Sequence, residues 1–283
     1  MGKCDITILC ENTSSGPMGL TGEHGLAVCI EKDGENILFD TGQGMSLANN
    51  ANLLGVDLSR IGTVILSHGH YDHTGGLPAV LYPPRGLEII AHPDIFTNKF
   101  AELETPTGKN LVFIGIKYKR NFLESSLKGK FNFITEFKEI RPGIFFSGEI
   151  PKKTDFEHPD TRLKVKKDGK MKPDPLLDDI SLLIETDKGP VVLLGCAHSG
   201  VVNILHHFSK KTGHSKFHAV IGGTHLGFTR SGEQLEKTMD VFDQYCIDLV
   251  AVSHCTGQEA AAICYNRFKK RFAFGSAGWS MAF

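Results

Sequence analysis

Short apolar runs, separated by turn residues, dominate the start of this chain. Runs of this length favour strands, because an amphipathic helix repeats its apolar positions over a longer stretch. Asp33-Gly34 stands between the second and third runs and is typical of a β-hairpin turn. The chain is therefore expected to open with antiparallel strands. These strands are predicted at 6–10, 26–30 and 36–40.

Beyond this opening, apolar strands alternate with segments whose spacing predicts helices, and the second half of the chain repeats the order of the first. Two similar halves of this kind predict two sheets that pack face to face with helices outside them. The expected fold class is therefore α/β. Further strands are predicted at 63–67, 87–92, 180–186, 191–194, 219–223 and 249–253, and helices at 46–54, from 75 onward, at 201–208, 232–245 and 258–268.

Residues 98–175 differ in character from the rest, because they are rich in Lys, Phe and Gly. Short strand-like runs occur at 111–116 and 143–146, and the lysine-rich segment 164–170 indicates an exposed hairpin or loop. We expect 98–175 to be an insertion laid over the functional site of a single domain that spans 1–283.

The bulk composition disfavours several classes of protein. Of the 283 residues, 41% are hydrophobic and 22% are charged, as in ordinary soluble proteins. The net charge of -1 gives no global field toward nucleic acid or an anionic membrane. No apolar run approaches the roughly 18 residues of a membrane span, and a signal-peptide pattern is missing. We therefore expect a cytoplasmic protein without nucleic-acid or membrane partners, and its oligomeric state stays open.

The cysteines do not form a structural pattern. There are seven, an odd number, and no C-x-x-C occurs, so neither a zinc ribbon nor a disulfide framework is indicated. Most are expected to be small buried apolar residues. Cys196 and Cys255 differ from the others, because each stands beside a candidate site histidine.

The strongest chemical signal is the segment 67–73, with the sequence SHGHYDH, which directly follows an apolar strand. His68 and His70 are two residues apart, so in an extended loop they point the same way and can bind one ion together. Asp72 and His73 come one turn later and can face a second ion. Imidazole and carboxylate ligands suit zinc, iron or manganese rather than calcium. Two such ions about 3.5–4 Å apart can act on one substrate oxygen.

Two further predicted strands end in histidine-bearing loops. His198 follows the strand at 191–194, and His254 follows the strand at 249–253. Loops at strand ends are where α/β scaffolds present functional side chains. We therefore expect these histidines to belong to the same site as the segment 67–73.

These residues carry a resemblance to a known family. The sequence HGHYDH at 68–73 matches the H-x-H-x-D-H signature of the metallo-β-lactamase superfamily, and Asp40-Thr41-Gly42 resembles its strand-end D-T-G. The chain is similar to one branch in particular, whose members are named 7,8-dihydropterin-6-yl-methyl-4-(β-D-ribofuranosyl)aminobenzene 5′-phosphate synthases or metal-dependent hydrolases. The resemblance implies a four-layer αββα sandwich with a dinuclear site at one edge. The matching stretches are 23–25, 67–76, 195–200, 221–226 and 253–257.

The resemblance also implies a ligand set. His68 and His70 would hold the first metal, while Asp72, His73 and His254 would hold the second. The implied cofactors are two divalent ions, zinc first, with iron or manganese as alternatives. The oxygen-reducing di-iron branch of the superfamily has glutamate at the position of His70, so the resemblance favours hydrolase or transferase chemistry.

The remaining ligands are less clear, because the superfamily usually has a histidine before one strand and a bridging aspartate after the next. Here Asp178 and Asp179 stand where the histidine is expected, and the sequence GCAH at 195–198 stands where the aspartate is expected. We predict that His198 is the ligand of the first metal. Cys196 and the two aspartates remain open as alternatives.

Other polar residues lie near these motifs. His225, at another strand end, could donate a proton to a leaving group or hold the substrate. It is a candidate catalytic residue together with Asp72. Glu23-His24 could reach the site from a loop, although a structural role is equally open. Asp40 is expected to orient a ligand histidine rather than to bind metal.

The leading functional hypothesis is an enzyme that acts on a small, anionic phosphate-containing or pterin-type molecule, as a hydrolase or a dihydropterin-transferring synthase. The alternative is a metal-dependent binding or sensor protein without turnover. In that case phenylalanines of 98–175 and its border could form an aromatic lid, although such residues are more often core. These are Phe96, Phe100, Phe113, Phe122, Phe131, Phe133 and Phe137.

Overall fold

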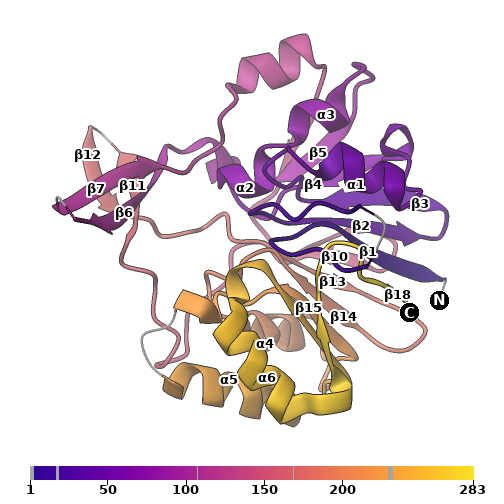
Figure 1. Ribbon diagram of the computed structural model, residues 1–283, viewed down its shortest axis with the longest axis vertical. Helices are drawn as coiled ribbons and strands as arrows, with labels where there is room; N and C mark the ends of the chain where they lie inside the picture. The colour runs from indigo at the N-terminus through magenta and orange to yellow at the C-terminus, as the bar shows by residue number, and fades with distance from the viewer. Residues whose placement is uncertain (1–2, 17–18, 107, 168, 229–231) are drawn as a thin grey trace.

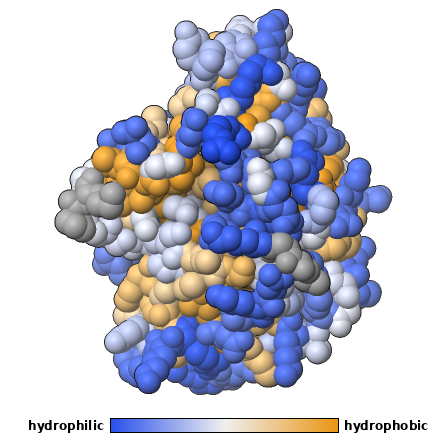
Figure 2. All heavy atoms as spheres, turned by 90° about the vertical axis from the view of Figure 1, so that its right-hand side faces the viewer, coloured by the Kyte–Doolittle hydropathy of each residue, from blue (hydrophilic) through white to orange (hydrophobic). Residues whose placement is uncertain are grey.

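The computed structural model describes residues 3–16, 19–106, 108–167, 169–228 and 232–283. Two seven-stranded sheets lie face to face between two layers of helices, so the fold is an αββα sandwich as predicted (Figure 1). Both ends of the described chain lie at the same side of the sandwich. Figure 2 shows this side, which is mostly hydrophilic, with apolar side chains in several separate patches.

The first sheet begins with the predicted antiparallel strands and continues with parallel ones. Its register places Ile6 opposite Ile30, and Ile30 opposite Ile37, so apolar residues line one face. The last strand of the chain pairs with the first and closes this sheet at one edge. In spatial order its strands are β18 (Ser280–Ala282), β1 (Cys4–Cys10), β2 (Ala27–Lys32), β3 (Glu35–Phe39), β4 (Thr63–Ile65), β5 (Glu88–Ala91) and β8 (Lys130–Phe133).

The second sheet also combines antiparallel and parallel strands. Its parallel strands read as continuous apolar runs, because both of their faces are buried. In spatial order its strands are β17 (Phe272–Phe274), β16 (Leu249–Ser253), β15 (Ala219–Gly223), β14 (Val191–Leu194), β13 (Ser181–Ile184), β10 (Ile144–Phe146) and β9 (Lys138–Arg141).

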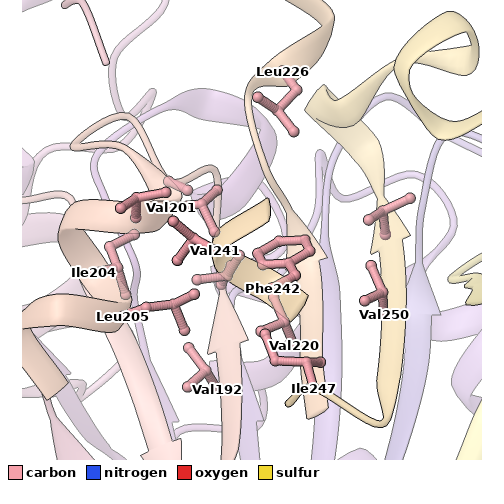
Figure 3. Close-up of a cluster of buried hydrophobic side chains, with 14 of the residues drawn as sticks. Val192, Val201, Ile204, Leu205, Val220, Leu226, Val241, Phe242, Ile247 and Val250 are labelled. Carbon is pink, nitrogen blue, oxygen red and sulfur yellow. The ribbon is translucent and has the colours of Figure 1, made fainter. Parts of the chain in front are cut away.

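Helices cover the outer face of each sheet. Figure 3 shows how the second layer packs: Val192, Val220 and Val250 on three strands meet the apolar side chains of the helices. A separate apolar core fills the space between the two sheets. The helices are α1 (Leu47–Leu53), α2 (Tyr71–Thr74) and α3 (Leu77–Leu81) on the first sheet, and α4 (Val201–Thr212), α5 (Gly232–Gln244) and α6 (Gln258–Phe268) on the second.

Single helical turns connect several of these elements. They are η1 (Leu58–Arg60), η2 (Pro93–Phe96), η3 (Phe122–Ser126), η4 (Leu226–Phe228), η5 (His254–Thr256) and η6 (Lys269–Arg271). None of the helices in the described ranges is long and apolar enough to cross a membrane.

Four strands form a smaller sheet that projects from the sandwich, at the left of Figure 1. We call it the cover sheet; it contains β12 (Lys170–Pro173), β11 (Leu163–Lys167), β6 (Lys99–Thr105) and β7 (Gly108–Phe113). The lysine-rich segment 164–170 falls in its β11–β12 hairpin, apart from residue 168, which lies outside the described residues. The predicted insertion 98–175 also contains β8, β9 and β10, which belong to the two main sheets. The division of the chain into one domain with an insertion stays a prediction.

Candidate metal centre

The residues 67–73, which we call the histidine loop, follow β4 and are held from behind by Asp40. The Ser67 backbone N–H and hydroxyl each donate a hydrogen bond of 2.7 Å to the Asp40 carboxylate. One oxygen of the same carboxylate lies 2.7 Å from Nδ1 of His73. Asp40 is fully buried. It therefore fixes the start of the loop and the orientation of His73, as expected from the sequence.

Three imidazoles form a first cluster of donor atoms. His68 Nε2 lies 2.9 Å from His70 Nδ1, and the ring of His198 packs edge-on against both rings at 4.9 and 5.1 Å. Burial lowers the pKa of His70 to about 3 and the pKa values of His68 and His198 well below their usual range. All three rings are therefore neutral, which is the form that binds metal.

A second cluster surrounds Asp72. Its Oδ2 lies 3.1 Å from Nε2 of His24, 3.4 Å from Nε2 of His254 and 3.9 Å from Nε2 of His73. The latter two nitrogens are 3.2 Å apart. Tetrahedral ligands about 2.0 Å from a shared zinc ion lie roughly 3.3 Å from one another. The cluster therefore has the spacing of a single-ion site.

The electrostatics of the second cluster favour positive charge. Burial opposes the charged form of His73, but Asp40 and Asp72 outweigh it and raise the pKa of His73 to about 9. Burial likewise raises the pKa of Asp72, but His73, His24 and His254 hold it well below its usual range. An anionic carboxylate among buried imidazoles is the environment that a divalent cation requires.

Unpaired polar atoms give an independent test of whether metal ions fit. His70 Nε2 and both ring nitrogens of His198 are buried and have no hydrogen-bond partner among the described residues. Buried polar groups without partners are rare in folded proteins unless an ion or water satisfies them. The donor chemistry and these free nitrogens therefore fit divalent ions.

The structure brings together the six histidine and aspartate residues that the sequence analysis assigned to metal, and separates the alternatives. Asp178 accepts hydrogen bonds from Lys99 and from the backbone N–H of Gly69, each 2.8 Å long. Asp179 accepts one of 2.7 Å from the backbone of Ser199. Both carboxylates thus stabilise neighbouring backbone, and neither belongs to a donor cluster found in the described part of the chain.

Cys196 is the alternative that does face the site. Its Sγ lies 3.2 Å from Nε2 of His73 and within 4.8 Å of the donor atom of His68. Cys255 lies on the other side of it and donates a hydrogen bond of 3.4 Å to the Cys196 carbonyl.

The role of His24 is undecided from the sequence, and the structure separates it from its neighbour Glu23. The Glu23 carboxylate accepts backbone hydrogen bonds from 43–46 and so has a structural role. The ring of His24 turns the other way, toward Asp72, and its centroid is 5.0 Å from that of His254. The sequence EHG at 23–25 was the only available signal, because the contact joins two loops about fifty residues apart.

His225 lies at the edge of the first cluster, with its ring centroid 4.3 Å from that of His198. Its Nε2 is 3.4 Å from the carboxylate of Asp160, which comes from the segment before the cover sheet strand β11. Burial disfavours its charged form, but Asp160 and the Cys255 sulfur outweigh burial and raise the pKa of His225 to about 9. His225 therefore carries a proton at neutral pH, as a proton donor must.

A cavity of about 440 Å³ opens over both clusters. The cover sheet supplies an apolar wall that includes Leu103, Val112 and Phe113, and two cations, Lys117 and Arg162, stand at its lining. A second, more polar cavity of about 820 Å³ adjoins it at His198 and His225. Neither cation can be recognised from the sequence, since no pattern near Lys117 or Arg162 indicates a site.

Three of the phenylalanines suggested as a lid belong to an apolar core instead. Phe96, Phe131 and Phe133 pack against one another beneath the first helix layer. Of the seven, Phe113 lines the cavity, where it is joined by Phe228. The aromatic part of the cavity is therefore smaller than the sequence suggested.

Comparison with known proteins identifies the family. Residues 20–254 match the sequence profile of the Metallo-beta-lactamase superfamily. The chain belongs to this superfamily. It is 32% identical to the 7,8-dihydropterin-6-methyl-4-(beta-D-ribofuranosyl)-aminobenzene-5'-phosphate synthase of Methanocaldococcus jannaschii, over 98% of this chain and 97% of that protein. An uncharacterized protein of the same archaeon is also 32% identical, over 90% of this chain and 91% of its own.

Solved structures agree with this assignment to the metallo-β-lactamase superfamily. The chain resembles Tm1679, described as a metal-dependent hydrolase of the beta-lactamase superfamily, with a TM-score of 0.82, 28% identity and 98% of each chain covered. A zinc-bound PqqB from Methylobacterium extorquens shares the fold, with a TM-score of 0.56 and 14% identity over 98% of this chain and 99% of that one. The superfamily and the names of these relatives indicate a metal-dependent enzyme.

Proposed function

We propose that this metallo-β-lactamase superfamily member is an enzyme with a dinuclear metal site that acts on a phosphate-containing or pterin-type small molecule. The observation that carries the proposal is the pair of donor clusters under one cavity, with unpaired nitrogens on His70 and His198. A purely structural cluster of buried imidazoles would leave these nitrogens unsatisfied at a cost of roughly 1–3 kcal/mol each.

In this proposal, His68, His70 and His198 hold one ion, and Asp72, His73 and His254 hold the other, with His24 beside the second. When bound, the two ions would polarise a substrate oxygen and lower the pKa of water in the site. The imidazole-rich donor set is consistent with zinc, and iron or manganese remain alternatives.

The protein's own residues have separate tasks in the reaction. Asp72 would hold the rings of His24 and His254 in place and keep a negative charge beside them. His225, protonated through its contact with Asp160, would give its proton to the leaving oxygen. Lys117 and Arg162 would bind the anionic group of the substrate. Phe113 and the rest of the apolar wall would exclude water from the ring of a pterin-type substrate.

The names of the relatives support two reactions. A 32% identical relative is named as a synthase of a dihydropterin compound, and a structural relative is described as a hydrolase. The synthase reaction would place a pterin in the apolar cavity, and the hydrolase reaction would need only one substrate and water. The second cavity, which meets the first at His225, leaves room for a second substrate and favours the synthase.

Metal analysis and activity assays test the proposal together. Purified protein is expected to contain about two divalent ions per chain, and to turn over a phosphate-containing or pterin substrate from a panel that also includes lactones and thioesters. Chelation and His68→Ala should each abolish turnover. Full activity in a verified metal-free sample would overturn the proposal. Tight binding of a pterin without turnover across the panel would instead favour a sensor.

A further inference from the structure

Cys196 lies between the two donor clusters. Its Sγ is within 4.8 Å of the donor atoms of His68 and His73, and it is equally close to those of His254 and Cys255. His68 belongs to the first cluster, and His254 belongs to the second. One sulfur atom is therefore within reach of both proposed ion positions.

Buried donor atoms surround this sulfur. Cys196 is 3% exposed, and its Sγ lies 3.2 Å from the ring nitrogen of His73 and beside the thiol of Cys255. A ligand sulfur about 2.3 Å from zinc and a ligand nitrogen about 2.0 Å from it lie roughly 3.5 Å apart. The contact is thus close to the distance expected for two ligands of one ion.

Carboxylates that could replace the sulfur are directed elsewhere. Asp178 and Asp179 hold the backbone of Gly69 and Ser199. Among the metal-sized clusters found in the described residues, Asp72 is the single carboxylate, and it is grouped with His24 and His254 rather than with Cys196. No carboxylate of these clusters therefore occupies the position between them.

Cys255 is close by but differs in its contacts. Its Sγ donates to the Cys196 carbonyl and accepts a hydrogen bond of 3.2 Å from the backbone N–H of His225. These two contacts join two loops, and the Cys255 sulfur also lies in a donor group with Cys196 and His254. Because Cys255 is buried and adjacent, it supplies the matched control that decides which of the two sulfurs binds metal.

We infer that the Cys196 thiolate is a ligand of the metal centre, in the position that bridges the two ions. This inference rests on the proposed dinuclear site but not on its substrate. On metal binding the thiol proton leaves to solvent, and a metal–sulfur bond forms. A thiolate ligand favours zinc or cobalt(II) over the harder manganese(II).

Cobalt(II) gives a direct readout of this sulfur. The full-length protein, freed of metal by chelation, is titrated with cobalt(II) chloride without oxygen, and the absorption spectrum is recorded. Wild type should bind about two ions per chain and develop an intense near-ultraviolet sulfur-to-cobalt charge-transfer band. Cys196→Ser should lose the band and bind cobalt at least about tenfold more weakly. Cys196→Asp should restore binding without the band, and Cys255→Ser should keep both.

The outcomes separate this inference from the proposed function. Two bound cobalt ions without a charge-transfer band in wild type, or a band that survives in Cys196→Ser, would overturn the sulfur ligand and leave the dinuclear site standing. If the band were lost in Cys255→Ser but kept in Cys196→Ser, the sulfur ligand would be Cys255 and the inference would be wrong. Failure of wild type to bind cobalt or zinc would overturn both ideas. X-ray absorption of the zinc-loaded wild type needs no variant, and should show sulfur at about 2.3 Å.

Discussion

Lys99 donates a hydrogen bond of 2.8 Å to Asp178, and this buried ion pair joins the cover sheet to the histidine loop. The other oxygen of Asp178 accepts the backbone N–H of Gly69, between two of the candidate ligands. The backbone N–H of Tyr71 also donates to the carbonyl of Ile114, beyond the end of β7. The sheet that lines the cavity is therefore bonded directly to the loop that would hold the metals.

Removing Lys99 should destabilise the protein strongly. Lys99→Met leaves the buried carboxylates of Asp174 and Asp178 without their cation, which typically costs about 3–5 kcal/mol. Denaturant unfolding of the metal-free protein measures the change. Lys109→Met, which removes an exposed lysine paired with Glu102, is the matched control and should change stability little. Equal effects of the two substitutions would contradict a structural role for the buried pair.

Asp40 should control metal affinity without binding metal itself. Asp40→Asn weakens the contacts to Ser67 and His73, so zinc affinity should fall about 10–100-fold, the effect typical of residues that orient ligands. Calorimetric titration of the metal-free protein with zinc measures it. The exposed Asp33→Asn serves as a control and should leave affinity unchanged. An unaltered zinc affinity in Asp40→Asn would show that the loop is held by other contacts.

Much of the fold could be predicted from sequence, because the central strands β13, β14 and β15 are buried on both faces and the turn between β2 and β3 uses Asp and Gly. The hairpin of β2 and β3 and the run of β14 are examples. The closing strands β17 and β18 were missed, since they are short. β18 also finds its partner at the opposite end of the chain, where Ala282 pairs with Asp5. Pairing over such a distance leaves no local pattern.

The candidate site likewise contains residues that could be predicted from the sequence and residues that could not. His68 and His70 were recognisable because their spacing alone brings two donors to one side of a loop. The choice among Cys196, Asp178 and Asp179 could not be made from sequence, because it depends on where each side chain points after folding. His24 is a similar case, since its contact with Asp72 exists only once the loop before β2 folds over the histidine loop.

The pH dependence of activity should report the His225–Asp160 pair. The folded pKa of His225 is raised to about 9, above its ordinary value near 6.5. The charged pair is therefore complete below pH 6.5, and its contribution to stability and proton donation is lost as pH rises through 9. The rate constant kcat/KM should fall on that alkaline limb. In Asp160→Asn the limb should move toward 6.5, and an unmoved limb would exclude His225 as the donor.

Lys117 should contribute to binding of anionic substrates rather than to chemistry. Its ammonium group lines the cavity and stands 4.8 Å from the ring centre of Tyr71, without an ion pair to a described carboxylate. Lys117→Met should raise KM for a phosphate-containing substrate about tenfold, equivalent to about 1.4 kcal/mol of binding, and leave kcat nearly unchanged. Steady-state kinetics should show no such rise with an uncharged lactone, if the protein accepts one, or in the exposed variant Lys119→Met. A fall in kcat with unchanged KM would instead place Lys117 in the chemical step, and no change in either constant would remove it from the binding site.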